Sequence, residues 1–202
     1  MNWDRLFEDL EGQLASEWEA ERAVLDAESE RLRIARLPLH TRLRSLSARR
    51  DSVVLDLADG RRVPGLVKTV GADWLACEPS VGGTSAARTV LLVPLRAVHG
   101  LSADHGALLD SLEDRDSTGS SLQHKASFGF VLRDLARRRI PLHVTMRNAG
   151  DVHGTIDRAG SDHLDLAVHD AGTARMASAV RGFRIIPFDA VVSVRLGADQ
   201  VR

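Results

Sequence analysis

The sequence predicts an α+β, mainly β protein, in which a long N-terminal helix is followed by two five-stranded barrels, each preceded by a short helix. Three observations lead to this fold class. No proline occurs before Pro38, and this first segment is rich in Glu, Ala, Leu and Arg. Two later segments nearly repeat each other, and each contains short apolar alternations interrupted by glycine. We expect the helix over 1–36, the first barrel over 39–101, a linker over 102–127 and the second barrel over 128–202.

The predicted N-terminal helix carries an apolar stripe at heptad-like spacing, with a four-residue step between Leu14 and Trp18. Its other faces are acidic, and Pro38 ends it because proline cannot continue a helix without losing a hydrogen bond. Such a stripe packs either on the helix's own domain or on a coiled-coil partner. The residues expected to face a partner or a second copy are Trp3, Phe7, Leu10, Leu14 and Trp18.

Two copies of one module follow this helix. They align without a gap from Leu43 with Leu132 to Glu78 with Ala167. Farther along, "VPLRAV" from Val93 matches "IPFDAV" from Ile186. The matched turn and strand residues are Gly65, Gly71, Asp73 and Leu75 in the first copy and Gly154, Gly160, Asp162 and Leu164 in the second. Chance does not preserve glycines, an aspartate and a proline in one order, so the chain contains an internal duplication.

Each copy has the pattern of a short amphipathic helix followed by five strands. "VVLDL" and "LHVTM" alternate apolar and more polar residues, as half-buried strands do. "ADGR" and "RNAG" are typical of tight turns into the second strand. Gly65 and Gly154 fall inside that second strand, where glycine indicates a strong bend or a close backbone approach. A bent second strand is what a small five-stranded barrel requires.

This arrangement resembles the Sm-like fold of the Sm, LSm and bacterial Hfq proteins. "VTMRNAGDVHGTIDRAGSDHLDLA" from Val144 is similar to the first Sm motif, and "IIPFDAVVSV" is similar in shape to the second motif of Hfq. The resemblance implies small barrels and RNA as a partner. The Lys-His pair with which Hfq binds uridine-rich RNA has no counterpart, because Phe188-Asp189 and Leu95-Arg96 stand there. Other SH3-like barrels, including the PRC type, are the alternative.

The resemblance also implies assembly, because Sm folds form rings by pairing the fourth strand of one copy with the fifth strand of the next. In a chain with two copies, we expect one such pair to form internally. Two outer edges then remain, and exposed edges are prone to aggregate. They meet other chains, giving a homo-oligomer such as a trimer with six barrels, or the N-terminal helix covers them. The length of that helix favours the homo-oligomer.

Repeated arginine clusters are the main chemical signal in the sequence. Arginine recognises phosphate through its planar fork of donors, so these clusters predict binding of RNA or single-stranded nucleic acid. The alternative is that they pair with the acidic N-terminal helix or remain solvated. The candidate nucleic-acid-binding residues are Arg44, Arg49, Arg50, Arg61, Arg62, Arg133, Arg137, Arg138 and Arg139.

Enzymatic chemistry has no support in the sequence. No phosphate-binding loop, dinucleotide fingerprint or nucleophile motif occurs, and four histidines in the second barrel match no metal-ligand spacing. We therefore expect a non-enzymatic binding or assembly module with no cofactor and no metal. The single Cys77 and the lack of a signal or membrane-spanning pattern favour a cytoplasmic protein without a membrane partner.

The partner class remains open between RNA and protein. A protein-interaction scaffold is the first alternative to nucleic-acid binding. The second is a DNA-binding transcriptional regulator, because the whole chain also resembles a group of proteins from high-GC bacteria that are named Fis-family regulators. The C-terminal segment has the pattern of a strand and not of a helix-turn-helix, which argues against this last role.

Overall fold

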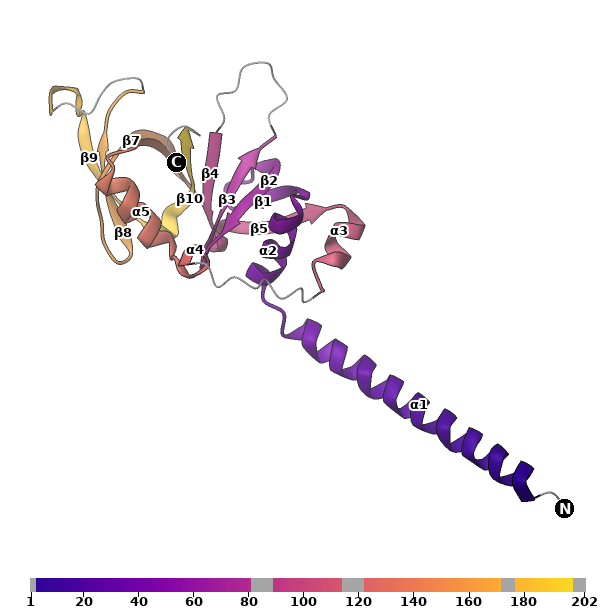
Figure 1. The fold of residues 1–202 in the computed structure, drawn as a ribbon. Coiled ribbons are helices and arrows are strands. Elements are labelled where there is room, and N and C mark those ends of the chain that lie inside the picture. Colours follow the sequence, from indigo (N-terminus) through magenta and orange to yellow (C-terminus); the bar gives the residue numbers. More distant parts are fainter. Residues whose placement is uncertain (1–2, 81–88, 114–121, 172–176, 198–202) are drawn as a thin grey trace. The chain divides into compact units, whose positions relative to one another are not determined.

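The structure is a computed structural model of the 202-residue chain and describes residues 3–80, 89–113, 122–171 and 177–197 (Figure 1). The chain divides into two units, Met1–Pro38 and Leu39–Arg202. The fold class is α+β, with an N-terminal helix and, in the described part, ten antiparallel strands. No helix in the described ranges is long and apolar enough to cross a membrane.

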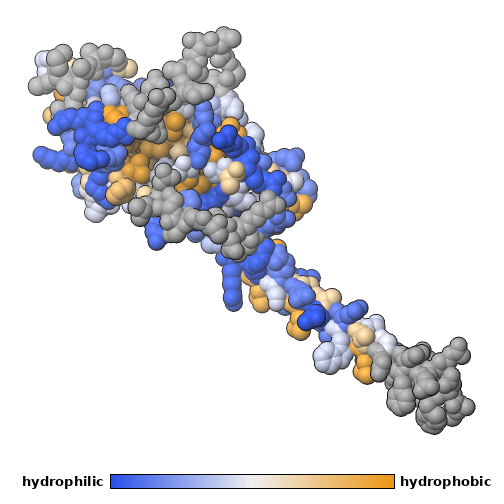
Figure 2. Space-filling view, in the orientation of Figure 1, coloured by the Kyte–Doolittle hydropathy of each residue, from blue (hydrophilic) through white to orange (hydrophobic). Residues whose placement is uncertain are grey.

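The first unit consists of helix α1 (Trp3–Ala35), which confirms the long helix predicted for this segment. Apolar residues recur along it between hydrophilic ones (Figure 2). Of the predicted partner stripe, Leu14 and Trp18 are exposed, Trp18 by 74%. The side chains of Trp3, Phe7 and Leu10 lie outside the described residues.

The second unit contains two halves of the same layout. In both halves a helix is followed by four strands, a 3-10 turn and a fifth strand, and the second half has a further 3-10 turn before its fourth strand. The first half comprises α2 (Leu39–Arg49), β1 (Ser52–Leu57), β2 (Arg62–Val70), β3 (Trp74–Pro79), β4 (Thr89–Pro94), η1 (Leu95–Ala97) and β5 (Val98–Ala103). Helices α3 (His105–Asp110) and α4 (Leu122–Lys125) lie between the halves in sequence. The second half comprises α5 (Phe128–Arg137), β6 (Pro141–Met146), β7 (Gly150–Ala159), β8 (His163–Val168), η2 (Ala177–Ala179), β9 (Gly182–Pro187), η3 (Phe188–Ala190) and β10 (Val191–Gly197).

Strand pairing joins the two halves into one sheet with the order β5-β1-β2-β3-β4-β10-β6-β7-β8-β9. This confirms the expected internal pairing of a fourth strand with a fifth, here β4 with β10. The two predicted five-stranded barrels are not found as closed barrels among the described residues, because their hydrogen bonds form a single open sheet. The physical reason is the β4·β10 pair, which makes each half continue into the other. Strands β5 and β9 remain as the outer edges (Figure 1).

The mid-strand glycines are explained by close backbone approach. A Cβ on Gly65 would lie 2.5 Å from the carbonyl oxygen of Glu78, and a Cβ on Gly154 would lie 2.3 Å from that of Ala167. Both strands also shift register a few residues later, between Val67 and Thr69 in β2 and at the matching place in β7. Glycine therefore lets the neighbouring strand lie against a sharply irregular second strand.

The two hydrophobic cores exchange residues across the junction. Trp74, Ala76 and Leu92 belong to the first half by sequence, yet they pack in the core of the second half. Val192 of β10 packs in the core of the first half in return. The junction between β4 and β10 is thus a packed interior as well as a row of hydrogen bonds.

Candidate functional site

Most of the predicted arginines of the first half form ion pairs with acidic residues of the sheet unit. Arg49 forms ion pairs with Asp110 and, at 3.3 Å, with Asp51. Arg62 pairs with Asp56 at 2.8 Å. Arg61 and Arg44 make further internal contacts: Arg61 binds Asp59 at 2.5 Å and the hydroxyl of Ser193 at 2.9 Å, and Arg44 donates to the carbonyl of His124 at 3.2 Å.

The second half repeats this behaviour. Asp134 accepts from Arg137 at 2.6 Å and lies 3.7 Å from Arg138. Arg133 donates to the carbonyl of Gly160 at 3.0 Å. The structure therefore does not gather the predicted arginines into one free basic surface. The acidic partners named here all lie within the sheet unit.

Arg50 and Arg139 differ from the other predicted arginines, whose side chains form ion pairs or hydrogen bonds within the sheet unit. They occupy equivalent positions just after α2 and α5, and neither side chain has an ion-pair partner among the described residues. Their backbones have positive φ values of 58° and 52°. Asp51 N donates to Leu46 O, and Arg50 N donates to Ser47 O, which is the helix-ending geometry usually completed by glycine.

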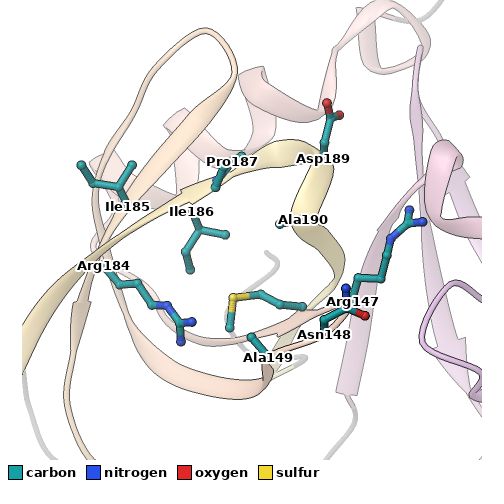
Figure 3. Close-up of a pocket in the computed structure, with 10 residues that line it drawn as sticks. Arg147, Asn148, Ala149, Arg184, Ile185, Ile186, Pro187, Asp189 and Ala190 are labelled. Carbon is teal, nitrogen blue, oxygen red and sulfur yellow. The ribbon is translucent and has the colours of Figure 1, made fainter.

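A cavity of about 280 Å³ lies beside β9, between the β6–β7 turn and η3 (Figure 3). Arg184 points into it and Met146 is among the residues that line it, whereas Arg147 and Asp189 point away. Asp189 instead forms an ion pair with Arg96 at 3.1 Å. The cavity thus has an apolar floor and a single inward cation. Sequence reasoning missed Arg184 and Arg147, because neither belongs to a repeated cluster.

Three histidines of the second half, His143, His153 and His169, contact one another through tilted and edge-to-face ring contacts. The rings of His143 and His153 are 4.5 Å apart, and those of His153 and His169 are 4.9 Å apart. His169 is buried and lies 2.9 Å from the hydroxyl of Thr155. In the described ranges, no group of three His, Cys, Asp or Glu side chains could hold a metal ion. Burial, with smaller effects of Arg195 and His153, lowers the pKa of His143 below its usual value.

The outer edge of the sheet at β9 exposes two large apolar side chains, Phe183 and Ile185. Phe183 and Ile185 are each 71% exposed. By the internal repeat they correspond to Val90 and Leu92 of β4. Leu92 is only 3% exposed and, with Val90, packs against the core of the second half. Two apolar side chains that are covered at the internal junction are therefore uncovered at this edge.

The half with the other outer strand, β5, also leaves exposed an apolar residue whose counterpart in the second half is buried. Helix α2 begins with Leu39, which is 48% exposed. Its counterpart Phe128, the first residue of α5, is 1% exposed and contacts Phe188 edge to face. Strand β5, the counterpart of β10, pairs with β1 on one side only. The candidate functional site therefore consists of two different edges that repeat the two sides of the β4·β10 junction.

A scan of the chain against protein-family models finds no match, and a search of curated proteins finds none either.

Proposed function

We propose that the chain is a non-enzymatic assembly module made of two Sm-like halves. The halves join within the chain through β4 and β10, and they join other chains through β9 and β5. Support for the Sm-like proposal comes from the strand order of each half. In both, the fifth strand pairs with the first, and the second, third and fourth follow in order after a short helix.

The single observation that carries the assembly proposal is the exposure of Phe183 and Ile185 at the positions of Val90 and Leu92. An exposed apolar strand at the end of a sheet is a template for adding another strand. Burying each of these side chains removes apolar surface from water and contributes about 1.5–3 kcal/mol when burial is complete. A second copy of the chain supplies the matching edge at β5.

The internal junction also specifies a register for the contact between chains. Leu92 lies opposite Val194, and Val90 lies opposite Leu196. Translated by the repeat, Ile185 lies opposite Leu101 of the next chain, and Phe183 lies opposite its Ala103. This pairing places the exposed side chains against the first-half core of that neighbour, as Leu92 packs against the second-half core here.

Because β9 and β5 are different surfaces, the association runs head to tail. Such an interface forms a ring if the rotation between subunits closes, and an open filament if it does not. We expect a closed ring, for which the resemblance to Sm-like proteins implies six halves and hence three chains.

Light scattering coupled to size exclusion tests the proposal. Wild-type protein is expected to elute with a mass of several chains, and Phe183→Arg and Ile185→Arg are expected to elute as single chains. Phe130→Arg is the matched control, because Phe130 is also exposed but lies on helix α5 and not on an edge strand. A wild-type monomer, or equal disruption by the control, contradicts assembly through these edges.

A second candidate function, binding of RNA or single-stranded nucleic acid, is supported by Arg50 and Arg139. Positive φ costs a non-glycine residue about 1 kcal/mol, and strain kept in both copies marks a candidate functional position. Arg50→Ala with Arg139→Ala is expected to weaken oligo-RNA binding and to reduce its salt dependence. The ion-paired Arg62 and Arg137 provide the control pair. No detectable affinity at low salt rules this function out, because phosphate contacts strengthen as salt falls.

A further inference from the structure

We infer that Asp162 caps the N-terminus of helix α2 of the next chain in the assembly. This inference rests on the proposed head-to-tail association through β9 and β5. Its basis is the contact between Asp73 and the start of helix α5, which joins the two halves of the chain. The equivalent residues at the two outer ends of the sheet, Asp162 and Leu39, have no such contact among the described residues.

The internal contact holds the start of α5 with the turn between β2 and β3. The carboxylate of Asp73 accepts a hydrogen bond from the backbone N–H of Phe128 at 2.6 Å. The carbonyl of Ala126 accepts from the backbone N–H of Ala72 at 3.0 Å and from Nε1 of Trp74 at 2.9 Å. The first N–H groups of a helix have no partner within it, and they favour a negative charge. Asp73 supplies both the acceptor and the charge.

The turn between β7 and β8 is the second copy of this turn, and among the described residues it accepts no hydrogen bond from the backbone N–H groups at the start of a helix. Asp162 stands at the position of Asp73. Its exposed carboxylate contacts only sequence neighbours within the described part of the chain: Ser161 at 3.4 Å and Nδ1 of His163 at 2.8 Å. The hydrogen bond from His163 lowers the pKa of Asp162. This turn therefore presents an ionised acceptor to solvent at the β9 end of the sheet.

Helix α2 is the second copy of α5, and its first turn lacks a side-chain cap. Ser127 precedes α5, and its hydroxyl accepts from the N–H of Phe130 at 3.3 Å. Pro38 stands before α2 and has neither a hydroxyl nor a carboxylate. Among the described residues the N–H of Leu39 has no hydrogen-bond acceptor. The helix without a cap belongs to the half with the β5 edge.

The two open partners meet if β9 pairs with β5 of the next chain in the register of β4 with β10. The carboxylate of Asp162 then accepts a hydrogen bond from the backbone N–H of the neighbour's Leu39, as the carboxylate of Asp73 accepts one from Phe128. The half-exposed Leu39 side chain becomes covered in the same step, as Phe128 is covered here. The carboxylate thus favours one orientation of the incoming chain, in which the N–H of Leu39 at the start of α2 lies at that position.

A double-mutant cycle tests the contact, with sedimentation equilibrium giving the dissociation constant between chains. Asp162→Ala is expected to weaken association about tenfold, the usual size of a lost helix cap, both in the wild-type chain and in Leu39→Ala. Leu39→Pro removes the N–H at a position where helices accept proline. In that background Asp162→Ala is expected to have no further effect. Asp162→Asn retains an acceptor without the charge and is expected to weaken association less than Asp162→Ala does. The neighbouring control Ser161→Ala is expected to associate like the wild type.

The outcomes separate this inference from the proposed function. If Phe183→Arg abolishes association but Asp162→Ala leaves the dissociation constant unchanged, assembly stands and the cap is overturned. An equal loss from Asp162→Ala in the Leu39→Ala and Leu39→Pro backgrounds also overturns it, because the carboxylate then acts on another group. A wild-type chain that stays monomeric at all concentrations overturns both. Circular dichroism of each variant checks that the fold is intact.

Discussion

Arg61, in the turn between β1 and β2, donates a hydrogen bond from Nη2 to the hydroxyl of Ser193 in β10 over 2.9 Å. Ser193 is fully buried, and the two residues belong to different halves of the sheet unit. An arginine that the sequence suggested for nucleic-acid binding therefore ties the halves together.

Arg61→Ala is expected to lower the free energy of unfolding by about 1 kcal/mol, because it leaves the buried Ser193 hydroxyl without this partner. Chemical denaturation at a fixed protein concentration measures the change. Arg62→Ala is the control, since its pair with Asp56 is exposed and contributes about 0.5 kcal/mol or less. Equal losses in the two variants would show that the link to Ser193 has no special weight.

Leu92→Ala is expected to lower the free energy of unfolding by about 2–5 kcal/mol, because it leaves a cavity in the core of the second half. Since Leu92 belongs to β4, the two halves should still unfold in one transition. Thermal unfolding followed by calorimetry and circular dichroism checks both statements. Leu109→Ala, at an exposed position of α3, is the control. Two resolved transitions would contradict a shared interior.

Cys77 is expected to react slowly with thiol reagents in the folded protein. It is fully buried, and burial, with a smaller effect of Glu78, raises its pKa to about 11. The thiolate is the reactive form, so it is scarce at neutral pH. Alkylation followed by mass spectrometry should be slow in buffer and fast in denaturant. Fast alkylation under native conditions would place Cys77 at an accessible surface.

The stability of the sheet unit is expected to fall as pH drops below about 6.5. Burial lowers the pKa of His143, and Arg195 and His153 act in the same direction, while Asp151 opposes them. The unfolded chain then binds more protons than the folded chain, so acid favours unfolding, and the contribution is complete above the unfolded pKa. His143→Gln should flatten the fall between pH 7 and 5, and His105→Gln, at an exposed position, should not. Burial also lowers the pKa of His40, so the free energy of unfolding of the His143→Gln variant should still decrease somewhat with falling pH.

A chain that begins at Leu37 is expected to retain self-association, because both edge strands lie in the sheet unit. Light scattering of the full-length and shortened proteins compares their masses. Loss of association in the shortened chain alone would assign assembly to the α1 stripe that includes Leu14 and Trp18. That result would also leave Phe183→Arg without effect on the mass of the full-length protein.

Local patterns predicted most of the secondary structure. Alternating residues such as those of "LHVTM" and the glycine of "ADGR" act over a few positions, so the strands and turns follow from sequence. The resemblance to Sm folds also led us to expect one internal pair of a fourth with a fifth strand, and β4 with β10 is such a pair. What the sequence could not predict is the exchange of Trp74, Leu92 and Val192 between cores. That exchange depends on how two halves pack in three dimensions.

The contacts of the arginine clusters could not be predicted from the sequence either. Their repeated spacing is visible in sequence, but their contacts depend on where acidic residues lie after folding. Arg49 pairs with Asp110, which is distant in sequence, and Arg61 reaches Ser193 across the junction. Conversely, the exposed pair Phe183 and Ile185 reads in sequence as an ordinary buried strand. Only the strand order shows that β9 is an outer edge.

The β4·β10 junction and the proposed β9·β5 contact are two copies of one interface under different physical conditions. The peptide chain tethers the two sides of the first, so they meet at an effective concentration on the order of millimolar whatever the abundance of the protein. The sides of the second must meet by diffusion, so their occupancy follows the protein's own concentration. Weakening substitutions of equal size therefore lower the stability of the fold at the tethered copy without separating its two sides, whereas at the free copy they disperse the assembly. Synthesis rate alone can then decide whether the chain exists as a single two-module unit or as a larger particle.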